Sequence, residues 1–464
     1  MAVVLCLTAL HAFPLLAGPV PKPWSEHGPL TVSENHHYLV HRDGTPFVWL
    51  GDTAWVLHEN ISREDAVAYL DDAAAEGFTL VQLMSVNGWA LSDLRNHYGD
   101  MPYIDENPWQ LNPPYWEHLG WVIDQAAERG LYVLLVYGSP GRKDEKVPFV
   151  HTPAEAYKYG RAIGAFLGDK PGLIWGGGID VNPDNQRSVS EMGSDGWPAM
   201  AEGVADGVNG EDSFDGKADY GTTLMTYHPS GGSITTTWFH DAPWLDFHGA
   251  QIGLSGDDIV SKFRAAWELP DPKPVVNLEP WYEGCTWKSP PVNDWECRTQ
   301  AYQSLFAGAC GYTYGGDLVY AFDSPGDEFS RRWREGLEAP GRCQMRHVRE
   351  LLESRPILER EPNLPIVVAS DGGGHESGLP TERIAASGSL TKGWAWIYSP
   401  QGRSFTVDLA QFARVPARAT WFDPRTGERR SAGRVPGGGQ AEFDPPGDPA
   451  PGNEWALMLG QRRQ

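Results

Sequence analysis

The segment spanning residues 131–180 decides the fold. It reads LYVLLVYG over residues 131–138, continues into an amphipathic stretch of helical length after Thr152, and ends with LIWGGGID over residues 173–180. Short apolar runs bounded by turn residues predict buried strands, and a capped amphipathic stretch between two of them predicts a connecting helix. This strand–helix–strand order is the repeating unit of a parallel α/β sheet.

The same alternation extends outward from this unit in both directions. Eight strands are predicted, with helices or long loops between them, at residues 46–52, 79–86, 131–138, 173–180, 222–228, 244–252, 274–279 and 311–315. Such a series predicts a (β/α)8 TIM barrel over residues 30–355. An open doubly wound sheet is the alternative, but GDTAW ends the first strand where that fold carries a glycine-rich dinucleotide fingerprint.

After Pro365 the pattern changes to short strands separated by turns, without a clear helix. This spacing predicts a small all-β sandwich over residues 366–464. The junction is expected between residues 350 and 365, a charged stretch that contains three prolines.

The N-terminal residues 2–18 are apolar and uncharged, but the run is short and interrupted by Pro14. It is predicted to be a signal peptide (residues 1–18) rather than a membrane span, although no basic residue precedes it. The protein is therefore expected to be secreted or periplasmic. Removal of Cys6 with this segment leaves four cysteines, of which Cys285 and Cys297 are the pair expected to form a disulfide; four unpaired thiols are the alternative.

The amino-acid composition indicates which classes of binding partner the protein can have. The chain has 37 basic and 61 acidic residues among 464, a net charge of −24, which argues against a nucleic-acid partner. Its 20 Trp, 17 Tyr and 16 Phe suit a cleft that faces sugars, although core packing is the commoner role of such rings. No phosphate loop, nucleophile elbow or zinc-spaced Cys or His motif occurs, so no cofactor and no metal is expected.

Two carboxylates occupy the strand ends where a barrel builds its active site. Asp180 closes the fourth strand behind three glycines, and Glu279 closes the seventh and is followed by Trp281. Cleavage of an acetal needs one carboxyl group that protonates the leaving oxygen and a second that attacks or activates water. Asp180 and Glu279 are therefore the candidate catalytic pair, and structural roles such as helix capping are the alternative for each.

Other polar and aromatic residues at the same end of the barrel are candidates for contact with the sugar. They are Asp52, Trp55, Asn87, Trp89, His228, Trp238, His248 and Trp281. For any single tryptophan core packing is an alternative role, and Asp52 is as well suited to orienting the barrel floor.

Several motifs occur in order along the chain: GDTAW (51–55), IWGGGID (174–180), TYHP (226–229), WLDFHGAQ (244–251) and NLEPWYEG (277–284). With these motifs the sequence resembles the apiosidase-like glycoside hydrolases, whose TIM barrel is followed by a β-sandwich of the type labelled collagen-binding. The resemblance implies activity on apiose-containing pectin, with the catalytic Asp at Asp180 and the catalytic Glu at Glu279. One departure is Ile179, which stands before the acid where the family has glycine.

The sequence therefore predicts a secreted glycosidase that cleaves a plant or microbial cell-wall polysaccharide. A carboxyl separation of about 5 Å would predict retention of the anomeric configuration, and one of roughly 8 Å would predict inversion. The alternative function is a polysaccharide-binding protein that holds the chain without cutting it.

Overall fold

The computed structural model describes residues 22–87, 94–137, 150–184, 193–255, 258–285, 288–322, 332–370 and 379–460. The predicted signal peptide and Trp89 lie outside these residues. Within them, no helix has the length and apolar character needed to cross a membrane.

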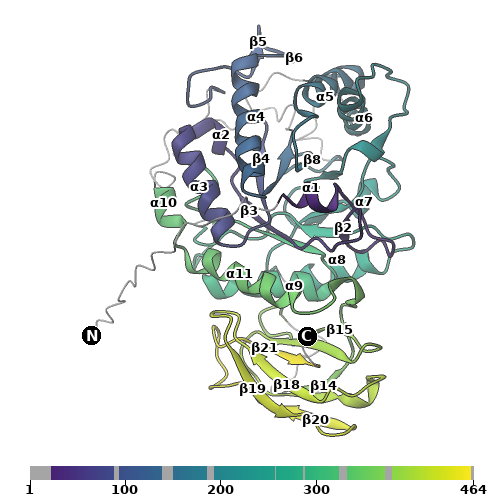
Figure 1. Ribbon diagram of the computed structural model, residues 1–464, viewed down its shortest axis with the longest axis vertical. Helices are drawn as coiled ribbons and strands as arrows, with labels where there is room; N and C mark the ends of the chain where they lie inside the picture. The colour runs from purple at the N-terminus through teal and green to yellow at the C-terminus, as the bar shows by residue number, and fades with distance from the viewer. Residues whose placement is uncertain are drawn as a thin grey trace.

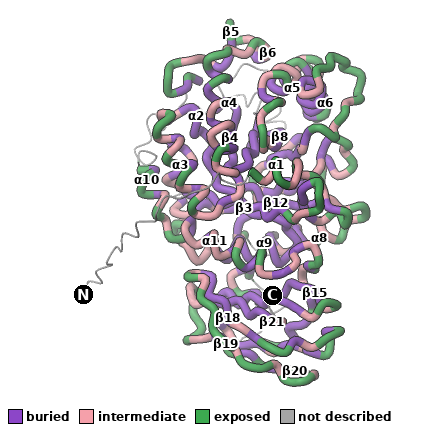
Figure 2. The backbone as a smooth tube through the Cα atoms, viewed as in Figure 1, coloured by how far each residue is buried: buried purple, intermediate pink, exposed green. Residues whose placement is uncertain are grey.

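The N-terminal part is a curled sheet whose strands carry near-continuous buried residues, as parallel strands covered on both faces require (Figures 1 and 2). All eight predicted strands are present, which confirms the barrel. They are β3 (Trp49–Thr53), β4 (Leu80–Met84), β7 (Tyr132–Val136), β8 (Leu173–Gly177), β9 (Met225–Tyr227), β11 (His248–Gln251), β12 (Val275–Asn277) and β13 (Gly311–Tyr314).

Hydrogen-bonded neighbours in this sheet follow the order β11-β12-β13-β3-β4-β7-β8-β9, and every one of these pairs is parallel. A short strand, β10 (Ser233–Ile234), adds an antiparallel edge to β11. The two ends of the series approach each other, since the backbone N–H of Asp246 donates to Met225 O at 2.9 Å and the Thr226 hydroxyl donates to Phe247 O at 2.8 Å.

Helices cover the outside of the barrel. The longer ones are α3 (Arg63–Ala75), α4 (Pro113–Glu128), α5 (Pro153–Leu167), α6 (Gly196–Asn209), α8 (Asp258–Trp267), α9 (Asp294–Ala307) and α11 (Pro340–Glu353). Side chains mark several of their starts. Thr152 and Glu155 form a capping box at α5, and Asn293 and Glu296 form another at α9.

Long insertions follow strands β4 and β8, and both contain regular structure. The insertion after β4 carries the hairpin of β5 (Tyr103–Ile104) and β6 (Asn107–Leu111), which projects from the end of the molecule remote from the sandwich (Figure 1). The insertion after β8 carries α6, which packs along α5. The sequence pattern does not predict this helix.

The C-terminal part is a sandwich of two antiparallel sheets, as predicted. One sheet has the order β14-β17-β20 and the other the order β15-β16-β21-β18-β19. The strands are β14 (Val367–Ser370), β15 (Ala385–Ser389), β16 (Trp394–Ser399), β17 (Phe405–Asp408), β18 (Arg418–Phe422), β19 (Arg429–Arg434), β20 (Gln440–Phe443) and β21 (Trp455–Leu459).

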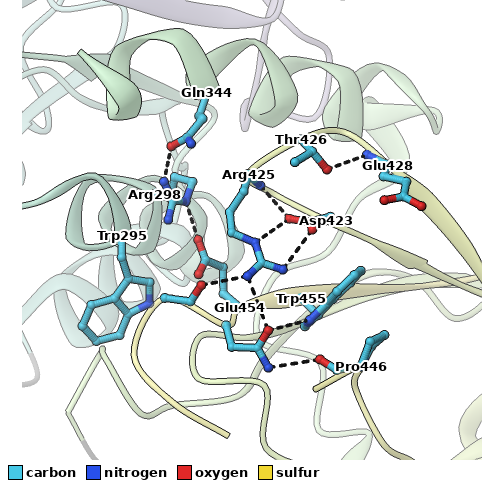
Figure 3. A network of polar contacts seen from close by, with 12 residues as sticks. Trp295, Arg298, Gln344, Asp423, Arg425, Thr426, Glu428, Pro446, Glu454 and Trp455 are labelled. Atoms are coloured by element: carbon cyan, nitrogen blue, oxygen red, sulfur yellow. Dashed lines mark hydrogen bonds and ion pairs between the residues drawn. The ribbon is translucent and has the colours of Figure 1, made fainter. Parts of the chain in front are cut away.

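Helices α9 and α11 lie between the barrel and this sandwich (Figure 1). The interface is aromatic and charged. Tyr302 of α9 stacks on Tyr398 of β16 with ring centroids 4.7 Å apart. Arg298 of α9 pairs with Glu454, which directly precedes β21, and both side chains are buried (Figure 3). The two parts therefore share one continuous buried interface.

Candidate active site

A cavity of about 460 Å³ opens at the carboxyl ends of the barrel strands. Asp180, three residues beyond β8, and Glu279, two residues beyond β12, both line it. The remaining lining residues are Trp55, Ile179, Gly231, Gly232, Gln251, Gly253, Ser255, Pro280, Trp281, Tyr282, Asp317 and Tyr320. The fold thus brings the two predicted carboxylates to one cavity with aromatic walls.

Glu279 is held by two neighbours, one at each carboxylate oxygen. The Tyr282 hydroxyl donates to Oε1 at 2.7 Å, and His228 Nε2 lies 3.2 Å from Oε2. Burial, and then the adjacent Glu279 charge, raise the pKa of Tyr282 well above that of free tyrosine, so its hydroxyl keeps the proton that it donates. The indole N–H of Trp55 donates to the same hydroxyl oxygen at 2.8 Å, which leaves the Tyr282 proton directed at Glu279.

His228 links the two carboxylate-bearing segments. Its ring is fully buried, and its Nδ1 accepts the backbone N–H of Asp180 at 3.4 Å. The other ring nitrogen, Nε2, faces the Glu279 carboxylate. The predicted sugar contact of His228 is corrected accordingly: its side chain is not exposed and contacts the Glu279 carboxylate and the main chain of Asp180.

The backbone at Asp180 has an unusual conformation. Its φ is +49°, in the left-handed region that non-glycine residues seldom adopt, and Gly178 two residues earlier has φ +67°. A Cβ on Gly178 would lie 2.6 Å from the Tyr227 ring, so this approach to β9 requires glycine. Backbone strain of this kind is commonly found at functional sites.

Trp281 forms one wall of the cavity. A Cβ on Gly253 would lie 2.2 Å from the indole, so the absence of a side chain there lets the ring pack against the backbone beyond β11. Lys288 Nζ lies 3.3 Å from the centroid of the same ring. Contacts with Gly253 and Lys288 therefore fix the position of the indole.

The structure does not bring Asp52 to this cavity. Its side chain is fully buried, accepts a hydrogen bond from the Tyr69 hydroxyl at 2.9 Å, and pairs with Arg342 of α11 at 3.0 Å. The predicted sugar contact is corrected accordingly: Asp52 ties the barrel to α11, because a guanidinium reaches it from the outer helix.

Three other predicted contacts also have different surroundings. His248 is buried between the Thr235 hydroxyl (2.8 Å) and His240 (3.2 Å), and burial lowers its pKa to about 3. Trp238 packs against the barrel core from α7 (Thr236–Phe239), and Asn87 donates its backbone N–H to Glu59 at 2.8 Å. None of these residues is among the described lining of the cavity. Of the predicted aromatic contacts, Trp55 and Trp281 do line it.

Lining residues with polar side chains that were not predicted as contacts include Gln251, Tyr282 and Tyr320. Tyr282 follows Glu279 by three residues, and Gln251 ends β11, so strand-end position could have indicated both. Nothing in the local sequence marks Tyr320, whose ring lies 5.3 Å from that of Tyr282.

The cysteines depart from the predicted pairing. Cys285 and Cys297 are buried free thiols in the structure, and burial raises the pKa of both. Each occupies apolar surroundings as a small hydrophobic residue, so no bond between them is formed. Among the described residues, no group of three or more His, Cys, Asp or Glu side chains is arranged to hold a metal ion.

Comparisons with known proteins cover nearly the whole chain. A family model described as "Apiosidase-like, catalytic domain" matches residues 33–359, and one described as "Putative collagen-binding domain of a collagenase" matches residues 374–460. No curated protein matches the chain.

Two solved structures match along almost their full length. One, described as a glycoside hydrolase, is 27% identical, with 95% of this chain and 99% of the other covered and a TM-score of 0.80. The other is a family 5 glycoside hydrolase from Bacteroides vulgatus, with the same identity and TM-score over 95% of this chain and 94% of that one.

Proposed function

Because the chain belongs to the apiosidase-like family of glycoside hydrolases, we propose that it cleaves a glycosidic bond with Asp180 as general acid/base and Glu279 as nucleophile. The observation that carries the proposal is that both carboxylates line one cavity of about 460 Å³ with tryptophan and tyrosine walls. Flat aromatic faces suit the apolar faces of a sugar ring.

The neighbours of each acid support these roles. Glu279 has a donor or a facing ring nitrogen at each oxygen, which suits a carboxylate that must stay in place to attack the anomeric carbon. The backbone N–H of Asp180 donates to His228, and this hydrogen bond fixes the main chain that bears the Asp180 side chain. In the first step the glycosidic C–O bond breaks as Asp180 protonates the leaving oxygen and Glu279 bonds to the anomeric carbon. In the second step Asp180 takes a proton from water, the water oxygen bonds to the anomeric carbon, and the bond to Glu279 breaks.

The substrate proposed is a polysaccharide of plant or microbial cell walls, with apiose-containing pectin as the first to be tested. The proposal includes export, which rests on the apolar residues 2–18. It assigns catalysis to residues 30–355 and an accessory role to residues 366–464.

The test is a set of three substitutions assayed on aryl glycosides and on pectic side chains: Asp180→Asn, Glu279→Gln and Asp317→Asn. Asp317 is the matched control, because it is a third carboxylate in the lining of the same cavity. We expect the first two variants to lose at least about 10²-fold in kcat, and the control to lose much less. Activity retained by Asp180→Asn but lost by Asp317→Asn would give the acid role to Asp317.

The anomeric configuration of the first product, followed by proton NMR, checks the role of Glu279. Retention is expected for a nucleophile, whereas inversion would make Glu279 the base that activates water. Polysaccharide binding without any new reducing ends would favour a binding protein instead.

A further inference from the structure

Helix α9 is buried on all sides although its sequence is polar. Every residue from 297 to 307 is buried, and these include Arg298, Thr299, Gln300 and Gln303. Such a helix cannot be oriented by an apolar stripe, so directional polar contacts must fix its position.

On the side facing the cavity, the contact is made by Gln300. Its Oε1 accepts the backbone N–H of Trp281 at 2.9 Å, and its Nε2 donates to the carbonyl oxygen of the same residue at 3.0 Å. The side chain is fully buried. One amide thus satisfies both main-chain groups of the residue that lies two positions after Glu279 and forms a wall of the cavity.

Other residues of α9 contact the sandwich. Arg298 pairs with Glu454, and Thr299 lies 3.2 Å from the Tyr398 hydroxyl. Gln303 Nε2 donates to the carbonyl oxygens of Pro380 and Arg383, each at 2.8 Å. Figure 3 shows the ion-pair part of this network. The sandwich therefore helps to fix the helix that carries Gln300.

We propose that Gln300 is a positioning residue of the reaction: it holds the Glu279–Trp281 segment in register with the cavity by clamping the Trp281 main chain. Glu279 and Trp281 are joined through Pro280, whose ring restricts the backbone between them, so a shift of the Trp281 backbone is transmitted to the carboxylate. The inference rests on the proposed role of Glu279 and adds a residue that touches neither substrate nor reacting atoms.

The chain offers a matched control on the same helix. Gln303, like Gln300, is fully buried and bonds two main-chain groups, but its partners lie in the sandwich rather than at the cavity. Gln300→Ala and Gln303→Ala should therefore lose similar stability in urea denaturation. We expect only Gln300→Ala to lose activity, by roughly 10- to 100-fold in kcat/KM, with a fall in kcat as well as a rise in KM.

A conservative variant keeps the inference testable if Gln300→Ala does not fold. Gln300→Glu retains the acceptor for the Trp281 N–H, and its carboxyl group can donate to the Trp281 carbonyl only when protonated. Its kcat/KM relative to the wild type should therefore recover as the pH is lowered. An unchanged ratio across pH would overturn the inference.

Glu279→Gln measured alongside separates the two proposals. If Glu279→Gln stays active, the proposed function fails. If it is inactive while Gln300→Ala and Gln303→Ala retain equal activity, the function stands and the positioning role of Gln300 is wrong.

Discussion

Replacing Arg298 by methionine should destabilise the protein by about 3–5 kcal/mol, because it leaves the Glu454 carboxylate buried without its cation. The side chain of Arg298 is 2% exposed and that of Glu454 is not exposed at all. Methionine fills much of the volume of the arginine stem, so the loss should reflect the unpaired charge more than an empty cavity.

The pH dependence of this variant gives a second signature. In the wild type, burial raises the pKa of Glu454 and the Arg298 charge opposes that rise. Without the guanidinium the pKa should rise further. A group whose pKa is higher in the folded than in the unfolded state stabilises the fold below the unfolded value, and this stabilisation is lost as pH rises through the folded value. The deficit of Arg298→Met should therefore grow as pH rises above the ordinary glutamate range.

The assay is equilibrium urea denaturation followed by tryptophan fluorescence and far-UV circular dichroism at several pH values. Arg264→Met is the control, because it breaks an Arg264–Glu268 pair whose side chains are 59% and 58% exposed and should cost no more than about 0.5 kcal/mol. The double variant Arg298→Met/Glu454→Leu removes both charges and should recover most of the loss. A loss in Arg298→Met no larger than in the control, or a deficit that shrinks with rising pH, would refute the reasoning.

Three further outcomes are expected. Tyr282→Phe keeps the ring but removes the donor to Glu279 and the acceptor of the Trp55 indole N–H, so kcat/KM should fall roughly 10- to 100-fold and the free energy of unfolding by about 1–3 kcal/mol; an unchanged kcat/KM would contradict this role. Burial holds the pKa of His248 at about 3, below its unfolded value, so stability present above pH 6.5 should be lost as pH falls, and the urea midpoint of His248→Gln should depend less steeply on pH between 7 and 5. Cys285 and Cys297 should both react with a thiol reagent after denaturation without reductant, and a shortfall of two thiols would mean that they are paired.

The strands of the barrel could be predicted because buried parallel strands are apolar along their whole length. The run at residues 132–136 (YVLLV) is buried at every position, so its pattern needs no knowledge of its partners. Helix α6 shows the limit of this reasoning. Its sequence, GWPAMAEGVADGVN, contains three glycines, which lower the intrinsic helix propensity. Its close packing along α5 is a tertiary contact that no local pattern reveals.

The site was predictable in position but not in detail. Asp180 and Glu279 follow from the rule that barrel chemistry gathers at the carboxyl ends of strands. The same rule selected Asp52 and His248, whose side chains contact other protein groups and do not line the cavity. The partner of Asp52 is Arg342, 290 residues away in the sequence, and the partner of His248 is His240, on a neighbouring loop. The position of a residue at a strand end tells how far along the barrel axis it lies. The direction in which its side chain points depends on contacts with residues distant in the sequence.

What separates Asp52 from Glu279 is therefore the chemistry of their partners. Asp52 is fully buried against a guanidinium, an arrangement that compensates its charge and shields it from any ligand. Glu279 has a tyrosine hydroxyl and a buried imidazole as neighbours and keeps 16% of its side chain exposed to the cavity. A hydrogen bond from the neutral Tyr282 hydroxyl orients the Glu279 carboxyl group, which suits the nucleophile role proposed for it. Since the two acids occupy equivalent strand ends, it is the long-range contacts created by the fold that give Asp52 a buried ion pair and leave Glu279 lining the cavity.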